Sequence, residues 1–511
     1  MGTVSDAFIA LPDGMNSGVK PALLKETAYA LGINLSSRGG LLHTRPGFTK
    51  DGVMPEPSGF QGAGRWSLNS GDRLVSVYNG NVYTTKVDTL EGTAHCALLA
   101  PGVQCFFCQA DRYMVIRDGT SAPVVLTEDP ATGIASVVPP AEVGLPAGYV
   151  MSFVHGRIHG VPRYVPGTTD NGQPYFLSGN ISLPNDPTTC YKPAAVDESD
   201  YLNEGGAHGL PMEMGYIKAM SVFRNAATGT GYGPLVILAQ RGLCAFDVTV
   251  PREDWKNQAI GQVLFFDTGT ESPWSPIQVN DDIFYRGPDG IRSLRYTAGA
   301  MATGGGTSLS NPAQSSEVSV YMDTEPVPAL PYVSMTFADN HMFTTVGAQA
   351  GTPQAFRGLA ALDTAYVGAF HAAVPPMWSG LWQLAGQTIA QVISLRRSGK
   401  LVPFIITTAG ELWHVDNDAV LDDGERIQSR LITREMSFGS LKSFKRLQYC
   451  NLWLSEIYHD VDIQLYYRPA GFPLWNVFGT AQTLKATTGT LPQRRRGIQF
   501  GLDMDAEQCD A

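Results

Sequence analysis

The sequence has little charge and no excess of positive charge. Only 16% of its 511 residues are charged, and 36 Lys and Arg against 47 Asp and Glu give a formal net charge of −11. Proteins that hold nucleic acid firmly neutralise its phosphates with clustered Lys and Arg. The composition therefore argues against stable nucleic-acid binding.

Long hydrophobic runs are also missing. No stretch of about 18 apolar residues occurs, and the start, MGTVSDAFIALPDG, lacks the basic end and apolar run of a signal peptide. The 7 cysteines are an odd number without the spacing of a disulfide framework, which predicts reduced thiols. We therefore expect a soluble protein made in the cytosol.

Common catalytic motifs are absent as well. The sequence contains no G-x-S-x-G elbow, no Walker glycine loop and no H-E-x-x-H helix. We therefore expect no enzyme, no catalytic residues and no cofactor. A glycosidase, however, needs only two carboxylates that meet in space, and sequence spacing does not exclude such a pair.

Turn residues and β-hairpins are abundant. The 55 Gly and 34 Pro predict many turns and few long helices. Two neighbouring hairpins, PLVILAQRGLCAFDV at 234–248 and PIQVNDDIFYRGPDGIRSLRY at 276–296, show the repeated unit: a strand, a polar turn and a returning strand. The pattern predicts an all-β protein.

The hairpins recur at intervals typical of a β-propeller. Turns at Asn79-Gly80, Asp118-Gly119 and His155-Gly156 lie about 39 and then about 37 residues apart, which suits one four-stranded blade. Later turns lie about 50 to 70 residues apart. We expect an irregular propeller of about six or seven blades with a long loop insertion.

Changes in composition divide the chain. Residues 1–70 predict an extended arm, in which residues 20–31 have helical spacing, and residues 71–425 the propeller. The Pro-, Gly- and Asn-rich segment 163–215 predicts an inserted loop. Longer alternating strands in 426–511 predict a final blade or a separate sandwich-like β region.

Three groups of residues have spacings that resemble metal sites. Cys105 and Cys108, with His95 and Cys96 upstream, form half of a zinc-ribbon pattern, but no second CxxC exists and buried strand thiols are favoured. The pair His155 and His159 is interrupted by a turn. An acidic loop predicts a solvated turn rather than a calcium site; it contains Asp416, Asp418, Asp422, Asp423 and Glu425.

One basic run, Arg494-Arg495-Arg496, stands out on this acidic chain. It suits contact with phosphate or with an acidic partner surface, and an exposed charged turn is the favoured interpretation.

Three stretches, in this order, resemble the tail nozzle (tail tubular) proteins of short-tailed bacteriophages. In the N-terminal stretch the matching residues are Asn34, Arg38, Gly39, Gly40, Arg45, Pro46 and Gly47. The second stretch is 233–296, with Ser272-Pro273, Asp282 to Tyr285 and Gly290 to Arg292. In the C-terminal stretch, 429–475, the matching residues include Arg434, Lys445, Tyr467, Arg468 and Trp475.

The resemblance implies a virion structural protein. It would form a homohexameric ring at the distal end of the tail, be made in the host cytoplasm, join the head-to-tail adaptor and carry fibres or tailspikes. Phage DNA would pass through without stable binding, which suits a negative wall. The N-terminal arm around residues 38–48 is expected to pack against a neighbouring subunit.

Two other functions remain open. The chain is alternatively a β-propeller enzyme acting on glycans, such as a tail-borne depolymerase, or an adhesin that binds a surface glycan or protein.

Overall fold

We analysed a computed structural model of the chain. The residues that it describes are 11, 13–38, 42–54, 56, 58–140, 145–163, 175–179, 207–224, 233–249, 254–255, 257, 260–279, 282–294, 313–364, 376–436, 449–454, 460–469, 471–484 and 496–501. The chain divides into two compact units, and the propeller unit extends from Ala10 to Thr433. The C-terminal unit begins at Arg434.

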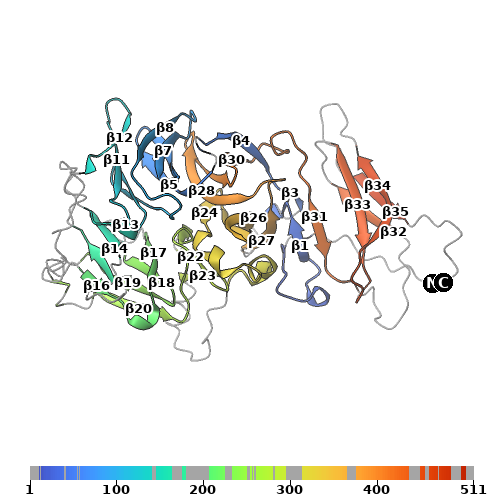
Figure 1. Cartoon of the computed structure of the whole chain (residues 1–511). Coiled ribbons are helices and arrows are strands. Elements are labelled where there is room, and N and C mark those ends of the chain that lie inside the picture. Colours follow the sequence, from blue (N-terminus) through green and yellow to red (C-terminus); the bar gives the residue numbers. More distant parts are fainter. Residues whose placement is uncertain are drawn as a thin grey trace. The chain divides into compact units, whose positions relative to one another are not determined.

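The first four blades of the propeller are four-stranded antiparallel sheets that follow one another in chain order (Figure 1). Blade 1 consists of β5 (Phe60–Leu68), β6 (Gly71–Tyr78), β7 (Asn81–Lys86) and β8 (Gly92–Ala97). Blade 2 consists of β9 (Phe106–Ala110), β10 (Tyr113–Arg117), β11 (Val124–Glu128) and β12 (Ala135–Val137). Blade 3 consists of β13 (Gly148–Val154), β14 (Arg157–Pro162), β15 (Tyr175–Ser178) and β16 (Ala207–Gly209). Blade 4 consists of β17 (Ile217–Val222), β18 (Leu235–Ala239), β19 (Gly242–Phe246) and β20 (Gly261–Phe266).

Three more blades complete the ring, and the last two belong to one ten-stranded sheet in which β26 and β28 pair through Phe356 and Ile389. Blade 5 has three described strands, β21 (Ile277–Val279), β22 (Asp282–Gly287) and β23 (Gly290–Ser293). Blade 6 consists of β24 (Met335–Ala338), β25 (His341–Gln349), β26 (Thr352–Asp363) and β27 (Met377–Trp382). Blade 7 consists of β28 (Ile389–Arg397), β29 (Lys400–Thr407), β30 (Glu411–Asp416) and β4 (Gly47–Val53).

Helical structure in the described residues is short. It comprises η1 (Pro21–Leu23), η4 (Met212–Met214), η6 (Ser316–Val318), α3 (Ser319–Met322) and η7 (Val327–Tyr332). No helix in these residues is long and apolar enough to cross a membrane.

Apolar cores between successive blades hold the ring together. Strands such as β10 (YMVIR) and β18 (LVILA) are buried at every position, because each blade packs against a neighbour on both faces. Seven separate clusters of buried side chains lie between blades 1–2, 2–3, 3–4, 4–5, 5–6, 6–7 and 7–1. The seventh cluster closes the circle, so the predicted propeller is confirmed, with seven blades.

An N-terminal strand supplies the outer edge of the last blade. Strand β4 pairs with β30 over the register Gly47↔Asp416 to Val53↔Glu411. Strand β5 of blade 1 follows in the chain, so the ring is closed by a segment that precedes its first blade. The propeller therefore begins before residue 71, within the segment predicted as an extended arm.

Blade 6 is widened by two further strands. Strand β1 (Tyr29–Ile33) pairs in parallel with β27 through Ile33 and Leu381, and β31 (Arg430–Thr433) pairs with β1. The short pair β2 (Leu35–Ser36) and β3 (His43–Thr44) connects β1 to β4. The helical spacing of residues 20–31 does not produce a helix of that length. Pro21 begins one 3-10 turn, and Tyr29 onwards is extended because two strands pair with it.

The predicted insertion contains part of a blade. Within 163–215, β15 and β16 complete blade 3, with Leu177 opposite Gly160 and Tyr175 opposite Gly209. The predicted turns occur where expected, but they do not connect equivalent strands. Asn79-Gly80 connects the second and third strands of blade 1, whereas His155-Gly156 connects the first and second strands of blade 3. The first strands of the blades actually begin about 40 to 70 residues apart.

Glutamine side chains join three pairs of adjacent blades. Gln109 of blade 2 accepts from the N–H of Ser67 in blade 1 at 2.8 Å and donates to its carbonyl at 2.7 Å. Gln391 of blade 7 makes the same two bonds to Ala63 of blade 1, at 2.8 and 2.9 Å. Gln278 of blade 5 makes the same two bonds to the main chain of Arg224, which follows β17 of blade 4. Each primary amide thus substitutes for the missing ladder between two inner strands.

The C-terminal unit contains two two-stranded sheets in its described residues. Strand β33 (Val461–Tyr467) pairs with β34 (Asn476–Leu484), and β32 (Tyr449–Leu454) pairs with β35 (Arg496–Gly501). Phe478 and Leu484 are buried in its core. Of the two alternatives predicted for this region, a final blade and a separate β region, the structure has the separate unit.

Candidate functional site: the N-terminal segment and the propeller axis

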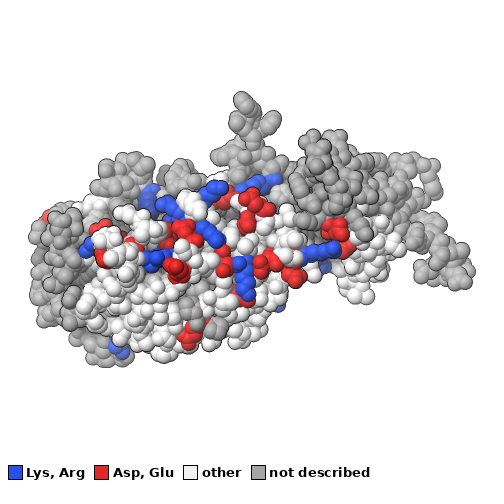
Figure 2. All heavy atoms as spheres, turned by 90° about the horizontal axis from the view of Figure 1, so that it is seen from above, with Lys and Arg blue, Asp and Glu red and all other residues white. Residues whose placement is uncertain are grey.

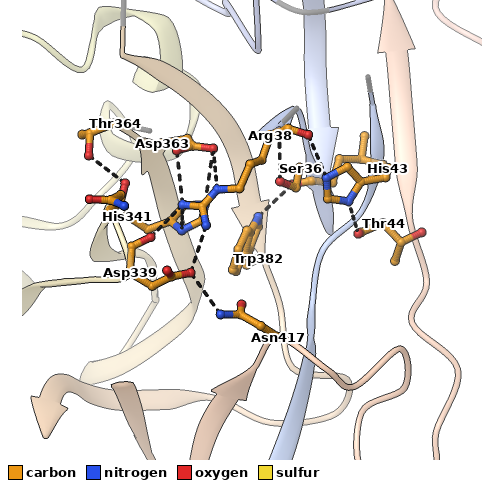
Figure 3. Close-up of polar contacts among 12 residues, drawn as sticks. Ser36, Arg38, His43, Thr44, Asp339, His341, Asp363, Thr364, Trp382 and Asn417 are labelled. Atoms are coloured by element: carbon orange, nitrogen blue, oxygen red, sulfur yellow. Dashed lines mark hydrogen bonds and ion pairs between the residues drawn. The ribbon is translucent and has the colours of Figure 1, made fainter. Parts of the chain in front are cut away.

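Arg38 binds a polar cluster at one end of blade 6 (Figure 3). Its Nε lies 3.1 Å from Asp363 Oδ2, its Nη1 lies 2.9 Å from Asp339 Oδ2, and its Nη2 lies 2.8 Å from His341 Nδ1. Partial burial lowers the pKa of Arg38, but the hydrogen bonds and charges of Asp363 and Asp339 outweigh it and raise that pKa overall. All three guanidinium nitrogens are therefore engaged within the chain itself.

His341 is neutral in this cluster. Arg38 only donates, so Nδ1 of His341 accepts and its ring proton lies on Nε2. Burial, followed by the positive charge of Arg38, lowers the pKa of His341 to about 4, while Asp363 and Asp339 oppose the shift. The cluster depends on an uncharged imidazole and holds the N-terminal segment against β25 and β26.

Arg45 makes a second, fully buried cluster. Its side chain is 0% exposed, and Nη1 and Nη2 lie 2.8 and 2.6 Å from the two carboxylate oxygens of Asp422. It also donates to the carbonyls of Pro46 and Gln383, each at 2.7 Å, and its guanidinium lies 3.8 Å from the Phe48 ring centroid. Burial lowers the pKa of Arg45, and the bonds to Asp422 partly offset this. The cluster fixes the start of β4.

Asn34 makes hydrogen bonds to three separate segments of the chain. Its Oδ1 accepts from Arg45 Nε at 3.0 Å and from the N–H of Gln383 at 2.6 Å, while its Nδ2 donates to the carbonyl of Gln428 at 2.8 Å. Ser429 Oγ donates to its main-chain carbonyl at 3.0 Å. Its φ of 55° is a conformation that asparagine tolerates better than most residues. One side chain thus links β4, the end of β27 and the segment before β31.

The N-terminal motif residues are therefore used inside their own chain. Arg38, Arg45 and Asn34 bind blades 6 and 7, and Gly47 begins β4 where a Cβ would lie 2.1 Å from the carbonyl oxygen of Leu421. Gly39 and Gly40 lie outside the described residues. The expected contact of this arm with a neighbouring subunit stays a prediction.

The axis of the propeller is occupied by side chains. Trp274 precedes β21 of blade 5, yet it lies against blade 1, since a Cβ on Gly62 would be 2.7 Å from Trp274 Cζ2. The same Cβ would lie 3.1 Å from Phe107 of blade 2. Blades 1 and 5 are not neighbours in a seven-membered ring, so the two meet across its centre. The φ of 142° at Gly62 is one that side chains rarely permit.

A second contact also crosses the axis. Gln104, just before blade 2, donates from Nε2 to the carbonyl of Pro331, which precedes blade 6, at 2.8 Å. Tyr332 follows Pro331, and its ring centroid lies 6.4 Å from that of Trp274. Four blades therefore contribute to a central plug, and the propeller has no open bore at this level.

Three described C-terminal motif residues, Tyr467, Arg468 and Trp475, make contacts within their own unit. Tyr467 packs edge-on against Phe478 at 5.9 Å, and the guanidinium of Arg468 lies 4.7 Å from the Trp475 ring centroid. Arg434 donates to the carbonyl of Glu435 at 3.3 Å. Lys445, Arg494 and Arg495 lie outside the described residues, and Arg496 begins β35.

The cysteines and histidines that resembled metal ligands belong to cores. Cys105 lies in the core between blades 1 and 2, whereas Cys108 lies in that between blades 2 and 3. Burial raises the pKa of the Cys105 thiol, and both cysteines are free. His159 is fully buried beside Trp255, and His155 occupies the predicted turn. Across the described ranges, no three His, Cys, Asp or Glu residues are placed to hold a metal ion.

The acidic loop has a structural role that its spacing did not reveal. Asp422, predicted to lie in a solvated turn, is only 4% exposed and binds Arg45. Asp423 and Glu425 are exposed, as expected of a turn. The partners Asp363 and His341 of Arg38 were not predicted at all, because they lie more than 300 residues away in the sequence.

Comparison with known proteins does not assign the chain to a family. No protein-family description and no curated protein matches the sequence. Among solved structures, "YCF48 bound to D1 peptide" is similar with a TM-score of 0.36 and 10% identity over 72% of this chain and 94% of that chain. The β-propeller domain of Myceliophteria thermophila Cps50 (Swd1) is similar with a TM-score of 0.38 and 10% identity over 70% of this chain and 97% of that chain.

The fold itself rests on the seven blades and the seven cores between them. The described residues form an all-β chain, in which a seven-bladed β-propeller closed by its own N-terminal strand is followed by a separate C-terminal β unit.

Proposed function

We propose that this chain is the subunit of a distal tail nozzle of a short-tailed bacteriophage. In this proposal six copies form a ring that joins the head-to-tail adaptor, carries fibres or tailspikes, and lets the genome pass. The chain has no catalytic task in it.

The observation that carries the proposal is the role of the N-terminal motif. Asn34, Arg45 and Gly47, which resemble the nozzle proteins in sequence, are the residues that fasten the closing strand β4 to blade 7. A resemblance in residues on which ring closure depends is better support for a shared architecture than one in exposed positions.

The occupied axis affects where the proposal puts a DNA conduit. Trp274 and Gln104 cross the centre of the propeller, so double-stranded DNA does not fit through a single subunit. The conduit would instead be the space that six propellers surround. On the face shown in Figure 2, acidic and basic side chains are interspersed, without a basic patch among the described residues that would retain phosphates.

Imaging of virions tests the proposal most directly. Antibody or tag density for this chain is expected at the tip of the tail with six-fold symmetry. Native mass measurement of the purified chain complements it, although a subunit that assembles only on its adaptor would stay monomeric alone. A stable trimer that cleaves host polysaccharide would favour the depolymerase, and a monomer on the fibre tips would favour the adhesin.

A further inference from the structure

Strand β31 is weakly attached to the propeller unit. It pairs with β1 on one side, and no other described strand pairs with it. Arg430, Leu431 and Thr433 are exposed, Leu431 by 38%. Short, exposed edge elements open locally at a much lower free energy than core strands. Because β31 ends where the C-terminal unit begins, its opening would affect that unit first.

Strand β1, by contrast, is anchored in the core. Tyr29 is 0% exposed, and its hydroxyl donates to the carbonyl of Ser379 at 3.0 Å. Tyr321 donates to the carbonyl of Gly32 at 3.0 Å. The ladder between β1 and β31 has four residue pairs, whereas β1 pairs with β27 through Ile33 and Leu381 alone. The buried Tyr29 and the bonds of Tyr29 and Tyr321 nevertheless keep β1 in place when β31 leaves.

Asn34 restrains the segment that leads into β31. Its Nδ2 donates to the carbonyl of Gln428, and Ser429 Oγ donates to the carbonyl of Asn34, so two side-chain bonds hold residues 428 and 429. Asn34 is itself held, since its N–H donates to the Leu381 carbonyl at 2.7 Å. A residue fixed to blade 6 thus keeps the tether in place.

We propose that residues 426–433 are a releasable tether and that Asn34 is the positioning residue that keeps it closed. Opening of β31 from β1 would lengthen the connection to the C-terminal unit by up to roughly 26 Å of extended chain. The C-terminal unit could then engage a partner at a distance while the propeller stays folded. This inference holds for any function of the chain.

Hydrogen exchange of the full-length chain, followed by mass spectrometry, tests the tether. Amides of β31 should exchange faster than those of β28. Asn34→Asp keeps the Oδ1 acceptor for Arg45 and Gln383 but replaces the donor to Gln428 by a second oxygen. We expect it to speed exchange in 430–433 by about tenfold, the value of one lost hydrogen bond, with blade 7 unchanged.

The chain offers a matched control. Asn340 has the same φ of 55° as Asn34, and its exposed side chain makes no hydrogen bond to the described residues. Asn340→Ala should leave exchange in β31 unaltered, whereas Asn34→Ala should speed it. Ser429→Ala gives a milder test if Asn34 variants fail to fold. The rate of trypsin cleavage after Arg430 should likewise be highest in Asn34→Ala, intermediate in Ser429→Ala and unchanged in Asn340→Ala.

Two results would overturn the tether. One is exchange of β31 in the wild-type chain as slow as that of β28. The other is an equal response of β31 to Asn340→Ala and Asn34→Ala, which would mean that the side-chain bonds of Asn34 do not restrain the segment.

Discussion

The N-terminal segment joins the propeller at two places that differ in kind. At blade 7, β4 forms a long ladder with β30, and the buried pair of Arg45 and Asp422 fixes its start. At blade 6, β1 pairs with β27 through Ile33 and Leu381, and the exposed strand β31 pairs with the other edge of β1. The first attachment closes the ring, while the second only extends a blade.

The difference shows how burial sets the importance of similar contacts. Arg45 is 0% exposed, whereas Arg38 is 31% exposed although it makes three hydrogen bonds to carboxylate oxygens against two for Arg45. A buried charge that loses its partner keeps its full desolvation cost, while water replaces the partner of an exposed one. We therefore expect substitutions at the blade 7 attachment to destabilise the propeller strongly and substitutions at the blade 6 attachment to destabilise it little.

The largest effect is expected from removing one partner of the buried pair. Arg45→Ala should leave the Asp422 carboxylate buried without its cation and destabilise the propeller by about 3 to 5 kcal/mol. Denaturant unfolding of the variant and the wild-type chain measures this loss in the free energy of unfolding. The double variant Arg45→Met, Asp422→Leu should recover much of the loss, because no unpaired charge remains. A loss below about 1 kcal/mol for Arg45→Ala would show that the closure does not depend on this pair.

Acid should weaken the blade 6 attachment. His341 has a pKa of about 4 in the folded chain and about 6.5 when unfolded, so the unfolded chain binds the proton first and stability falls as the pH drops through this window. Between pH 7 and pH 5 the loss from His341 should be about 2 kcal/mol. His341→Asn, whose Oδ1 keeps an acceptor for Arg38, should reduce the slope of stability against pH.

The glutamine bridges allow the same comparison between buried and exposed contacts. Gln391→Leu leaves the N–H and carbonyl of Ala63 without partners in a buried place, which should cost about 1 to 3 kcal/mol. Gln278→Leu breaks the equivalent bonds at an exposed place, where water replaces them, and should cost less than about 0.5 kcal/mol. Equal shifts in the unfolding midpoint of the two variants would contradict the role of burial.

The smallest effect is expected at Asp339. Its side chain is 40% exposed, and the ion pair with Arg38 is open to solvent. Asp339→Ala should cost no more than about 1 kcal/mol, and the cost should shrink in high salt. Asp363, which is 2% exposed and binds the same arginine, serves as the contrasting position. If the two alanine variants were equally destabilised, exposure would not govern this cluster.

Much of the fold could be predicted from local patterns. The turns at Asn79-Gly80 and His155-Gly156 have positive φ at both residues, as such dipeptides require in tight hairpins. Turn chemistry acts between neighbours in sequence, so it is readable without a structure. The same patterns do not say which two strands of a blade a turn connects, and the spacing of turns was therefore a poor measure of the spacing of blades.

The candidate site could be predicted only in part. Asn34, Arg38 and Arg45 were singled out, but as residues for a subunit contact. In this chain Arg38 binds Asp339 and Asp363, Arg45 binds Asp422, and Asn34 binds Arg45, Gln383 and Gln428. Nothing local distinguishes a buried aspartate from its exposed neighbour in the loop 416–425. Burial of Asp422 follows from the position of β4, which folds against a strand more than 350 residues away.

The sequence by itself determined the all-β class, because alternating and continuous apolar runs between Gly-rich turns have few other ways to bury their side chains. Only the tertiary structure decided that the ring has seven blades and that an N-terminal strand closes it. It also decided that Trp274 and Gln104 occupy its axis. These features depend on contacts between residues far apart in the chain, whose energies arise only when the whole ring brings them together.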